Sequence, residues 1–231
     1  MQFGYQTMPT SDDSWTGRLR TIGELERPDH WHLEEGDSCV FFGEYTPGEN
    51  WGHSSTNQLI LNLKKKPSRA RGTPQWPHKM RAIRDVAAAI RLNLMPEALA
   101  TTLFVPIPSS KGPTHPDFDP RMLQIAQGIG QPARAAELIK AIGDRPAFHE
   151  NNEPRDSGVL MQQLQVSTSP LPPNSERIIL IDDMITTGCS YRACKNLLEA
   201  QYPDVPVFGL FVARRILPNP FAAFDIHDAP C

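Results

Sequence analysis

The chain has 231 residues, a formal net charge of −3 and hydrophobic residues at 39%, a composition typical of soluble globular proteins. Its length suffices for one large or two small domains that need no metal or disulfide support. No apolar run approaches the roughly 18 residues of a membrane span, and the first residues lack the basic start and apolar stretch of a secretion signal. We therefore expect a cytoplasmic protein with no membrane partner.

The four cysteines, at positions 39, 189, 194 and 231, form no Cys-x-x-Cys pair and have no regular spacing. This argues against both a disulfide framework and a zinc ribbon. His30 and His32 flank Trp31, but without a third ligand at a recognisable spacing they fit an exposed strand or loop better than a metal site.

Charge divides the beginning of the chain into two parts. Residues 1–50 carry a net charge of −7, whereas residues 64–91 carry +8. The basic run surrounds Trp76 and could contact a nucleic-acid backbone through charge and stacking. Solvated helix and loop faces explain such runs more often, so both interpretations stay open.

Two runs, Cys39–Tyr45 and Gln58–Lys64, are predicted to be short strands joined by a loop rich in glycine, asparagine and serine. All four tryptophans also lie in the first third of the chain. We therefore predict an N-terminal accessory subdomain over residues 1–74, hood-like or partner-binding, and a core over residues 75–231.

The predicted core alternates helices and strands. From Pro77 apolar residues recur every three or four positions, which predicts a helix that ends before Pro96. The further predicted elements are strands at Leu103–Ile107, Arg177–Ile181 and Val205–Val212, and helices at Met122–Ile129, Ala133–Ile142 and Ser190–Ala200. This order favours an α/β fold, a Rossmann-like, mostly parallel sheet with flanking helices. The polar segment Gly143–Ser175 is expected to be irregular and functional or mobile.

The stretch from Arg177 to Ser190 contains the most informative pattern. Four apolar residues precede Asp182 and Asp183, so both carboxylates are expected at the carboxyl end of a strand, where open α/β sheets bind ligands. Thr186, Thr187 and Gly188 then offer hydroxyls and a permissive backbone at the start of a helix, a site that attracts phosphate. The alternative is a strand, turn and helix of any α/β protein that happens to end in two aspartates.

Two acids followed by a Thr-Thr-Gly turn resemble the phosphoribosyl pyrophosphate (PRPP) motif of type I phosphoribosyltransferases. The resemblance implies a type I phosphoribosyltransferase-like fold and magnesium-dependent transfer of phosphoribose from PRPP to a nitrogen acceptor, with release of pyrophosphate. By the same resemblance Asp182 and Asp183 are catalytic, and they address the ribose hydroxyls directly or through Mg²⁺. The implied 5′-phosphate site consists of Thr186, Thr187, Gly188, Cys189 and Ser190.

Upstream, the residues from Phe104 to Lys111 resemble the pyrophosphate loop of this family, and the chain as far as Arg121 is most similar to its competence-associated, ComF-like branch. The implied pyrophosphate-binding residues are Ser109, Ser110, Lys111 and Arg121. A proline-stiffened surface turn is the alternative. His149 and Arg155 occupy the place of the flexible loop of the family, although a histidine and an arginine in a polar loop are often only solvated.

The acceptor, a base or an amine, is not identified by the sequence. Purine-salvage relatives carry an acid at the position of Thr186, which counts against that substrate class. Two further functions stay open: a PRPP-sensing or nucleic-acid-binding regulator without transfer activity, and an effector of a bacterial defence or stress module that docks a protein partner through residues 1–74. Family members are commonly dimers, so a homodimer is expected by analogy.

Overall fold

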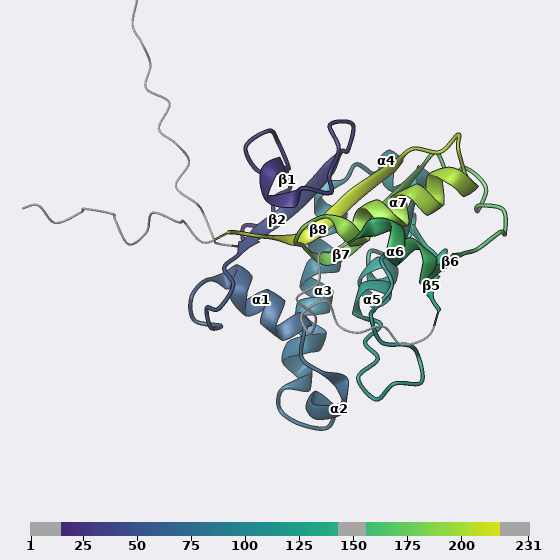
Figure 1. Cartoon of the computed structure of the whole chain (residues 1–231). Coiled ribbons are helices and arrows are strands. Elements are labelled where there is room, and N and C mark those ends of the chain that lie inside the picture. Colours follow the sequence, from purple (N-terminus) through teal and green to yellow (C-terminus); the bar gives the residue numbers. More distant parts are fainter. Residues whose placement is uncertain (1–14, 143–155, 218–231) are drawn as a thin grey trace, which may run out of the picture.

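The computed structural model describes residues 15–142 and 156–217, which form an α/β fold around a six-stranded sheet (Figure 1). The strand order is β1-β2-β8-β7-β3-β4, and only β1 runs antiparallel to its neighbour. The strands are β1 (Arg20–Thr21), β2 (Cys39–Tyr45), β3 (Thr102–Pro106), β4 (Arg134–Ala135), β7 (Arg177–Ile185) and β8 (Val207–Arg215). The predicted mostly parallel sheet with flanking helices is therefore confirmed.

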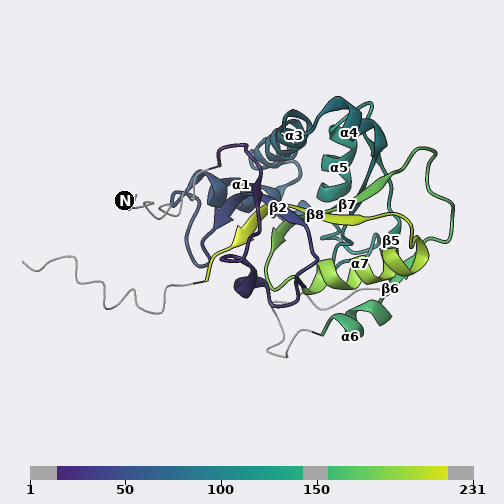
Figure 2. The same ribbon diagram turned by 90° about the horizontal axis from the view of Figure 1, so that it is seen from above.

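Helices cover both faces of this sheet, as Figure 2 shows most clearly. The helices are α1 (Ser55–Leu63), α2 (Pro67–Ala70), α3 (Trp76–Asn93), α4 (Pro96–Thr101), α5 (Arg121–Gly128), α6 (Ser157–Gln162) and α7 (Cys189–Gln201), with a 3-10 turn at Arg27–His30. Helices α1, α3 and α5 pack on one face, while α7 and α6 pack on the other together with a small antiparallel hairpin of β5 (Ile139–Ala141) and β6 (Leu164–Val166).

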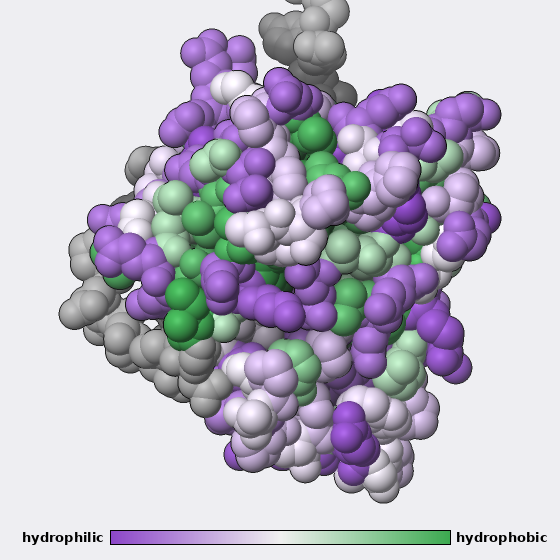
Figure 3. All heavy atoms as spheres, turned by 90° about the vertical axis from the view of Figure 1, so that its right-hand side faces the viewer, coloured by the Kyte–Doolittle hydropathy of each residue, from purple (hydrophilic) through white to green (hydrophobic). Residues whose placement is uncertain are grey.

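The central strands are buried on both faces because their side chains alternate between two apolar layers. In β3, Leu103 and Val105 join the layer under α7, whereas Phe104 joins the layer under α3 and α5. Figure 3 shows the side of the molecule that lies on the right in Figure 1, where hydrophilic residues separate the exposed apolar residues into several groups. Within residues 15–142 and 156–217, no helix combines the length and apolar character needed to cross a membrane.

The connections create a switch point between β3 and β7. The chain leaves β3 through α5 towards β4 on one face of the sheet, and it leaves β7 through α7 towards β8 on the other face. These two strands are neighbours, with Pro106 of β3 opposite Ile181 of β7. Open α/β sheets bind ligands in the crevice that such diverging connections leave at the carboxyl ends of the strands.

Two predicted elements are wrong. The run Gln58–Lys64 falls in helix α1 and its C-cap residue Lys64. Leu59, Ile60 and Leu63 share one buried face of this helix, and Ser54 caps its first turn by accepting a hydrogen bond from Asn57. The predicted helix Ala133–Ile142 is replaced by β4 and β5, because its two halves pair with different partners, β3 and β6. Tertiary pairing has overridden a local pattern of apolar residues at helical spacing.

The other predicted elements are confirmed to within a few residues at their ends, namely β2, β3, β7 and β8 and the helices α3, α5 and α7. The segment predicted to be irregular contains α6 and β6, and its residues 143–155 lie outside the described residues. Strand β2, from the predicted N-terminal subdomain, lies inside the sheet and pairs in parallel with β8 along its length. The division at residue 74 stays a prediction.

Candidate functional site

A cavity of about 670 Å³ opens at the carboxyl ends of β3 and β7. Residues that were predicted from two separate sequence segments line it together: Ser109, Ser110, Lys111, Arg121, Asp182, Asp183, Thr186, Gly188, Cys189 and Ser190. Thr187 is buried and does not line the cavity. His149 and Arg155 lie outside the described residues.

The turn after β7 depends on a glycine. Gly188 has a φ of +84° and is the N-cap residue of α7, a backbone conformation that L-residues with a side chain rarely adopt. A Cβ atom added there would also lie 3.2 Å from the side chain of Leu33. The backbone at 186–188 is therefore fixed by both its conformation and its close packing.

Residues 30–33 form a brace against this turn. The ring Nδ1 of His30 donates a hydrogen bond to the carbonyl of Thr186, and the backbone N–H of His32 donates to the carbonyl of Thr187 at 2.9 Å. His30 is fully buried, and burial lowers its pKa, so the ring is neutral. The predicted exposed loop at the two histidines is therefore wrong for His30, because that ring packs into the interior behind the turn.

Ion pairs anchor this brace to α7. Arg192 donates to the carbonyl of His32 at 3.1 Å and pairs with Asp37. Lys195, one helical turn further, lies 2.7 Å from the other oxygen of Asp37. The N-terminal segment and α7 are thus held together directly behind the turn that lines the cavity.

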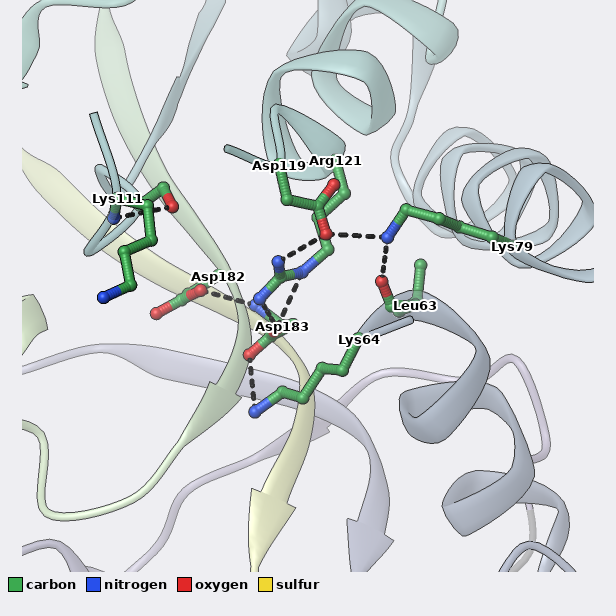
Figure 4. Close-up of polar contacts among 9 residues, drawn as sticks. Leu63, Lys64, Lys79, Lys111, Asp119, Arg121, Asp182 and Asp183 are labelled. Carbon is green, nitrogen blue, oxygen red and sulfur yellow. Dashed lines mark hydrogen bonds and ion pairs between the residues drawn. The ribbon is translucent and has the colours of Figure 1, made fainter. Parts of the chain in front are cut away.

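The second aspartate of the pair is surrounded by cations (Figure 4). Its Oδ2 accepts hydrogen bonds from Arg121, with the Nε atom at 2.9 Å and the Nη2 atom as a second donor. Its Oδ1 lies 3.4 Å from the ammonium of Lys64, which follows the last residue of α1. Both oxygens of Asp183 therefore face a positive charge.

A buried pair of charges lies behind Arg121. Oδ2 of Asp119 accepts from Nη1 of Arg121 at 2.8 Å and from the ammonium of Lys79 at 2.7 Å. Lys79 is 1% exposed and also donates to the carbonyl of Leu63. Three elements, α1, α3 and the start of α5, thus converge on Asp183.

The two adjacent carboxyls have different protonation behaviour. Burial and the neighbouring Asp183 raise the pKa of Asp182 to about 7. Burial also acts to raise the pKa of Asp183, but Arg121 and Lys64 outweigh it and hold that pKa at about 2. At neutral pH one carboxyl of the pair is ionised, and the other titrates.

The loop after β3 forms the opposite wall of the cavity. Pairing with β7 extends to Ile107, whose N–H donates to the carbonyl of Ile181 at 2.9 Å, and the loop follows from there. The N–H of Lys111 donates to the hydroxyl of Ser109 at 3.3 Å, a local turn that holds the lysine at the cavity. A lysine and small hydroxyl residues at a cavity wall are suited to binding an anion.

The donor chemistry fits a magnesium ion at Asp182 better than at Asp183. One oxygen of Asp182 accepts the N–H of Asp183 at 2.7 Å, whereas both oxygens of Asp183 already face cations. Within the described part of the chain no three His, Cys, Asp or Glu side chains are grouped to hold a metal. Mg²⁺ commonly binds proteins through one or two carboxylates and completes its shell with water and substrate phosphates.

Sequence reasoning missed Lys64, Lys79 and Asp119. The signal for Lys79 was present, because it lies four and seven residues before Ile83 and Val86 on the apolar stripe of the predicted helix. Lysine is almost never fully buried unless it is paired, so a lysine on that stripe indicates a buried acid nearby. Lys64 and Asp119 lie in loops and offered no comparable signal.

The chain matches no protein-family model, and no curated protein matches its sequence.

Proposed function

We propose that this protein is a type I phosphoribosyltransferase-like enzyme that transfers phosphoribose from PRPP to a nitrogen acceptor and releases pyrophosphate, with Mg²⁺ as cofactor. The observation that carries the proposal is one cavity, at the ends of neighbouring strands, that combines three parts. These are the acidic pair on β7, the glycine-capped turn at the start of α7 and the lysine-bearing loop after β3. An acid pair flanked by two anion-binding loops suits a sugar that carries phosphate at both ends.

Each part of the cavity would bind a different part of PRPP. Residues 186–190, at a helix N-terminus, would hold the 5′-phosphate. Asp182 and Asp183 would orient the ribose hydroxyls, and the loop at 109–111 would hold the pyrophosphate. Asp182 would hold the Mg²⁺, whose charge would help to neutralise the pyrophosphate leaving group.

The same residues would favour the reaction step. Positive charge develops on the sugar as the bond to pyrophosphate breaks, and fixed carboxylates beside the ring stabilise such charge. Arg121 and Lys64 hold Asp183 ionised and contact both of its carboxylate oxygens, so the orientation of this carboxylate is set before substrate arrives. The acceptor nitrogen would approach from the opposite side of the leaving group, and its identity, a base or an amine, is left open.

Isothermal titration of PRPP into the protein, with and without Mg²⁺, tests the proposal. We expect micromolar, magnesium-dependent binding that is lost in the double variant Asp182→Asn/Asp183→Asn. The matched control is Asp204→Asn, which removes an exposed carboxylate outside the cavity lining and should bind as the wild type does. If the wild type binds no PRPP, or if the double variant binds it equally well, the proposal is wrong.

A second candidate is a PRPP-sensing regulator that binds nucleic acid. A smaller hollow of about 290 Å³ is lined by Lys65, Lys66, Arg69, Ala70 and Gln75, without an acidic residue, and it shares Lys66 with the main cavity. Such a basic surface at the rim of a ligand site would suit a phosphate backbone, and ligand binding could then alter nucleic-acid affinity.

A further inference from the structure

We infer that Lys79 is a positioning residue, because its one buried ammonium fixes both cations that hold Asp183. The inference rests on the proposed role of Asp183 in substrate binding, but its geometry is independent of which substrate binds. Lys79 does not line the cavity and acts entirely through other residues.

The first connection runs through Asp119. Lys79 lies 2.7 Å from Oδ2 of Asp119, and the same oxygen accepts from Nη1 of Arg121 at 2.8 Å. The guanidinium of Arg121 then presents Nε and Nη2 to Asp183. A planar guanidinium held at Nη1 has little freedom to rotate, so the position of Asp119 sets the orientation of the Asp183 carboxylate.

The second connection runs through the end of α1. Lys79 also donates to the carbonyl of Leu63, the last residue of that helix. The next residue, Lys64, places its ammonium 3.4 Å from Oδ1 of Asp183. By fixing the helix end, Lys79 therefore sets the point from which Lys64 reaches the carboxylate.

Stability alone does not account for a lysine at this position. Its neighbours on the buried stripe of α3 are Ile83, Val86 and Ile90, and an apolar residue would continue that stripe without removing a charge from water. Buried ion pairs replaced by apolar residues of similar size are often equally stable or more stable. The ammonium of Lys79 is connected to both Arg121 and Lys64, the two cations that hold Asp183. Positioning these cations is a role that an apolar side chain could not fill.

The charges of this cluster also point towards an anionic ligand. Lys64, Lys79 and Arg121 contribute three positive charges, whereas Asp119 and Asp183 contribute two negative ones. An arriving phosphate would balance the remaining positive charge. Lys79 thus adds to the potential of the cavity as well as to its geometry.

The test compares Lys79→Met and Asp119→Asn with the control Arg177→Met, which alters an ion pair with Glu176 at the opposite end of β7. The first readout is the ¹⁵N–¹H resonance of the Arg121 side-chain Nε, assigned by its loss in Arg121→Lys. We expect both test variants to shift this resonance and to speed its exchange with solvent about tenfold, and the control to leave it unchanged. This readout requires no ligand.

The second readout is magnesium-dependent PRPP affinity, which we expect to fall about 10- to 100-fold in Lys79→Met, as for residues that orient direct ligands. The double variant Lys79→Met/Asp119→Asn should lose little more than Lys79→Met alone, because the two residues act through one connection. If Lys79→Met does not fold, the isosteric variant Asp119→Asn decides the question by the same measurements.

An unchanged Arg121 resonance in a folded test variant would overturn the inference. If the wild type binds no PRPP while the resonance moves as expected, the proposed function fails and the positioning role of Lys79 stands. If PRPP affinity is unchanged although the resonance moves, Lys79 orients Arg121 without consequence for binding, and the inference is wrong.

Discussion

Asp182 and Asp183 are adjacent in the sequence, but they face different surroundings. Successive side chains of a strand point to opposite faces, so Asp183 points towards Arg121 and Lys64, whereas its neighbour points away from them. The difference between their pKa values follows from this geometry. The sequence predicted the pair as a unit, and only the fold separates the two roles.

The raised pKa of Asp182 predicts a pH-dependent stability. Between the ordinary pKa of an aspartate and about 7, the folded protein binds more protons at this carboxyl than the unfolded protein does, so its contribution to stability falls as the pH rises through that window. Asp182→Asn, measured without magnesium, should therefore raise the Tm at pH 8 by about 2–4 °C.

At pH 5 the wild-type carboxyl is protonated, and the same substitution should leave the Tm nearly unchanged. Thermal unfolding followed by circular dichroism at the two pH values measures the difference. An equal change in Tm at pH 5 and pH 8 would contradict the prediction, because it would mean that ionisation of Asp182 does not affect stability.

Among the elements, the strand, turn and helix from β7 to α7 could be predicted from the sequence because their signals are local. Apolar residues, two acids and a glycine follow one another within a few positions. The brace at residues 30–33 could not be predicted, since nothing near His30 indicates that its partner is Thr186, 156 residues away. The same applies to β4 and β5, whose partners are also distant in the sequence.

The turn itself gives a test at this scale. Gly188→Ala combines a strained φ with a close contact to Leu33, and we expect it to lower the free energy of unfolding by about 1–3 kcal/mol and to weaken PRPP binding. Chemical denaturation measures the first effect. Gly36→Ala is the matched control, because its Cβ would meet no atom within 4 Å and its φ is not positive.

The double variant Gly188→Ala/Leu33→Ala separates the two causes. It removes the contact with the Leu33 side chain but keeps the strained backbone. If Gly188→Ala lowers the free energy of unfolding less in the Leu33→Ala protein than in the wild type, the difference measures the contribution of the steric contact. A Gly188→Ala protein as stable as the wild type would show that the turn accepts a side chain, contrary to its geometry.

At the scale of the whole molecule, the division of charge in the sequence has a structural explanation. Acids from residues 1–50 pair with cations far along the chain: Asp37 with Arg192 and Lys195, and Glu44 with Arg214. These acids are therefore largely neutralised. In the basic run Lys66 pairs with Asp117 at 3.6 Å, but the side chains of Arg69, Arg71, Arg81, Arg84 and Arg91 are exposed to solvent.

The exposed basic surface allows a test of the second candidate function, a regulator that binds nucleic acid. If the basic surface binds a phosphate backbone, a labelled single-stranded oligonucleotide should bind with an affinity that falls steeply as salt rises. Lys65→Glu/Arg69→Glu should weaken that binding at least tenfold, as measured by fluorescence anisotropy, and leave PRPP binding intact. Binding that is insensitive to salt, or to the substitution, would exclude this surface as the nucleic-acid site.

The brace and the central sheet also determine when during synthesis the site can form. Strand β2 lies beside β8, and Glu44 meets Arg214 across a separation of 170 residues. At about 5–20 residues per second, β2 leaves the ribosome many seconds before its neighbour exists, with the side chains of Phe41 and Phe42 still lacking their core. The turn at 186–188 can meet its brace at residues 30–33 only after α7 has been made, and the sheet beside it is complete only with β8, so the cavity forms late in the synthesis of the chain.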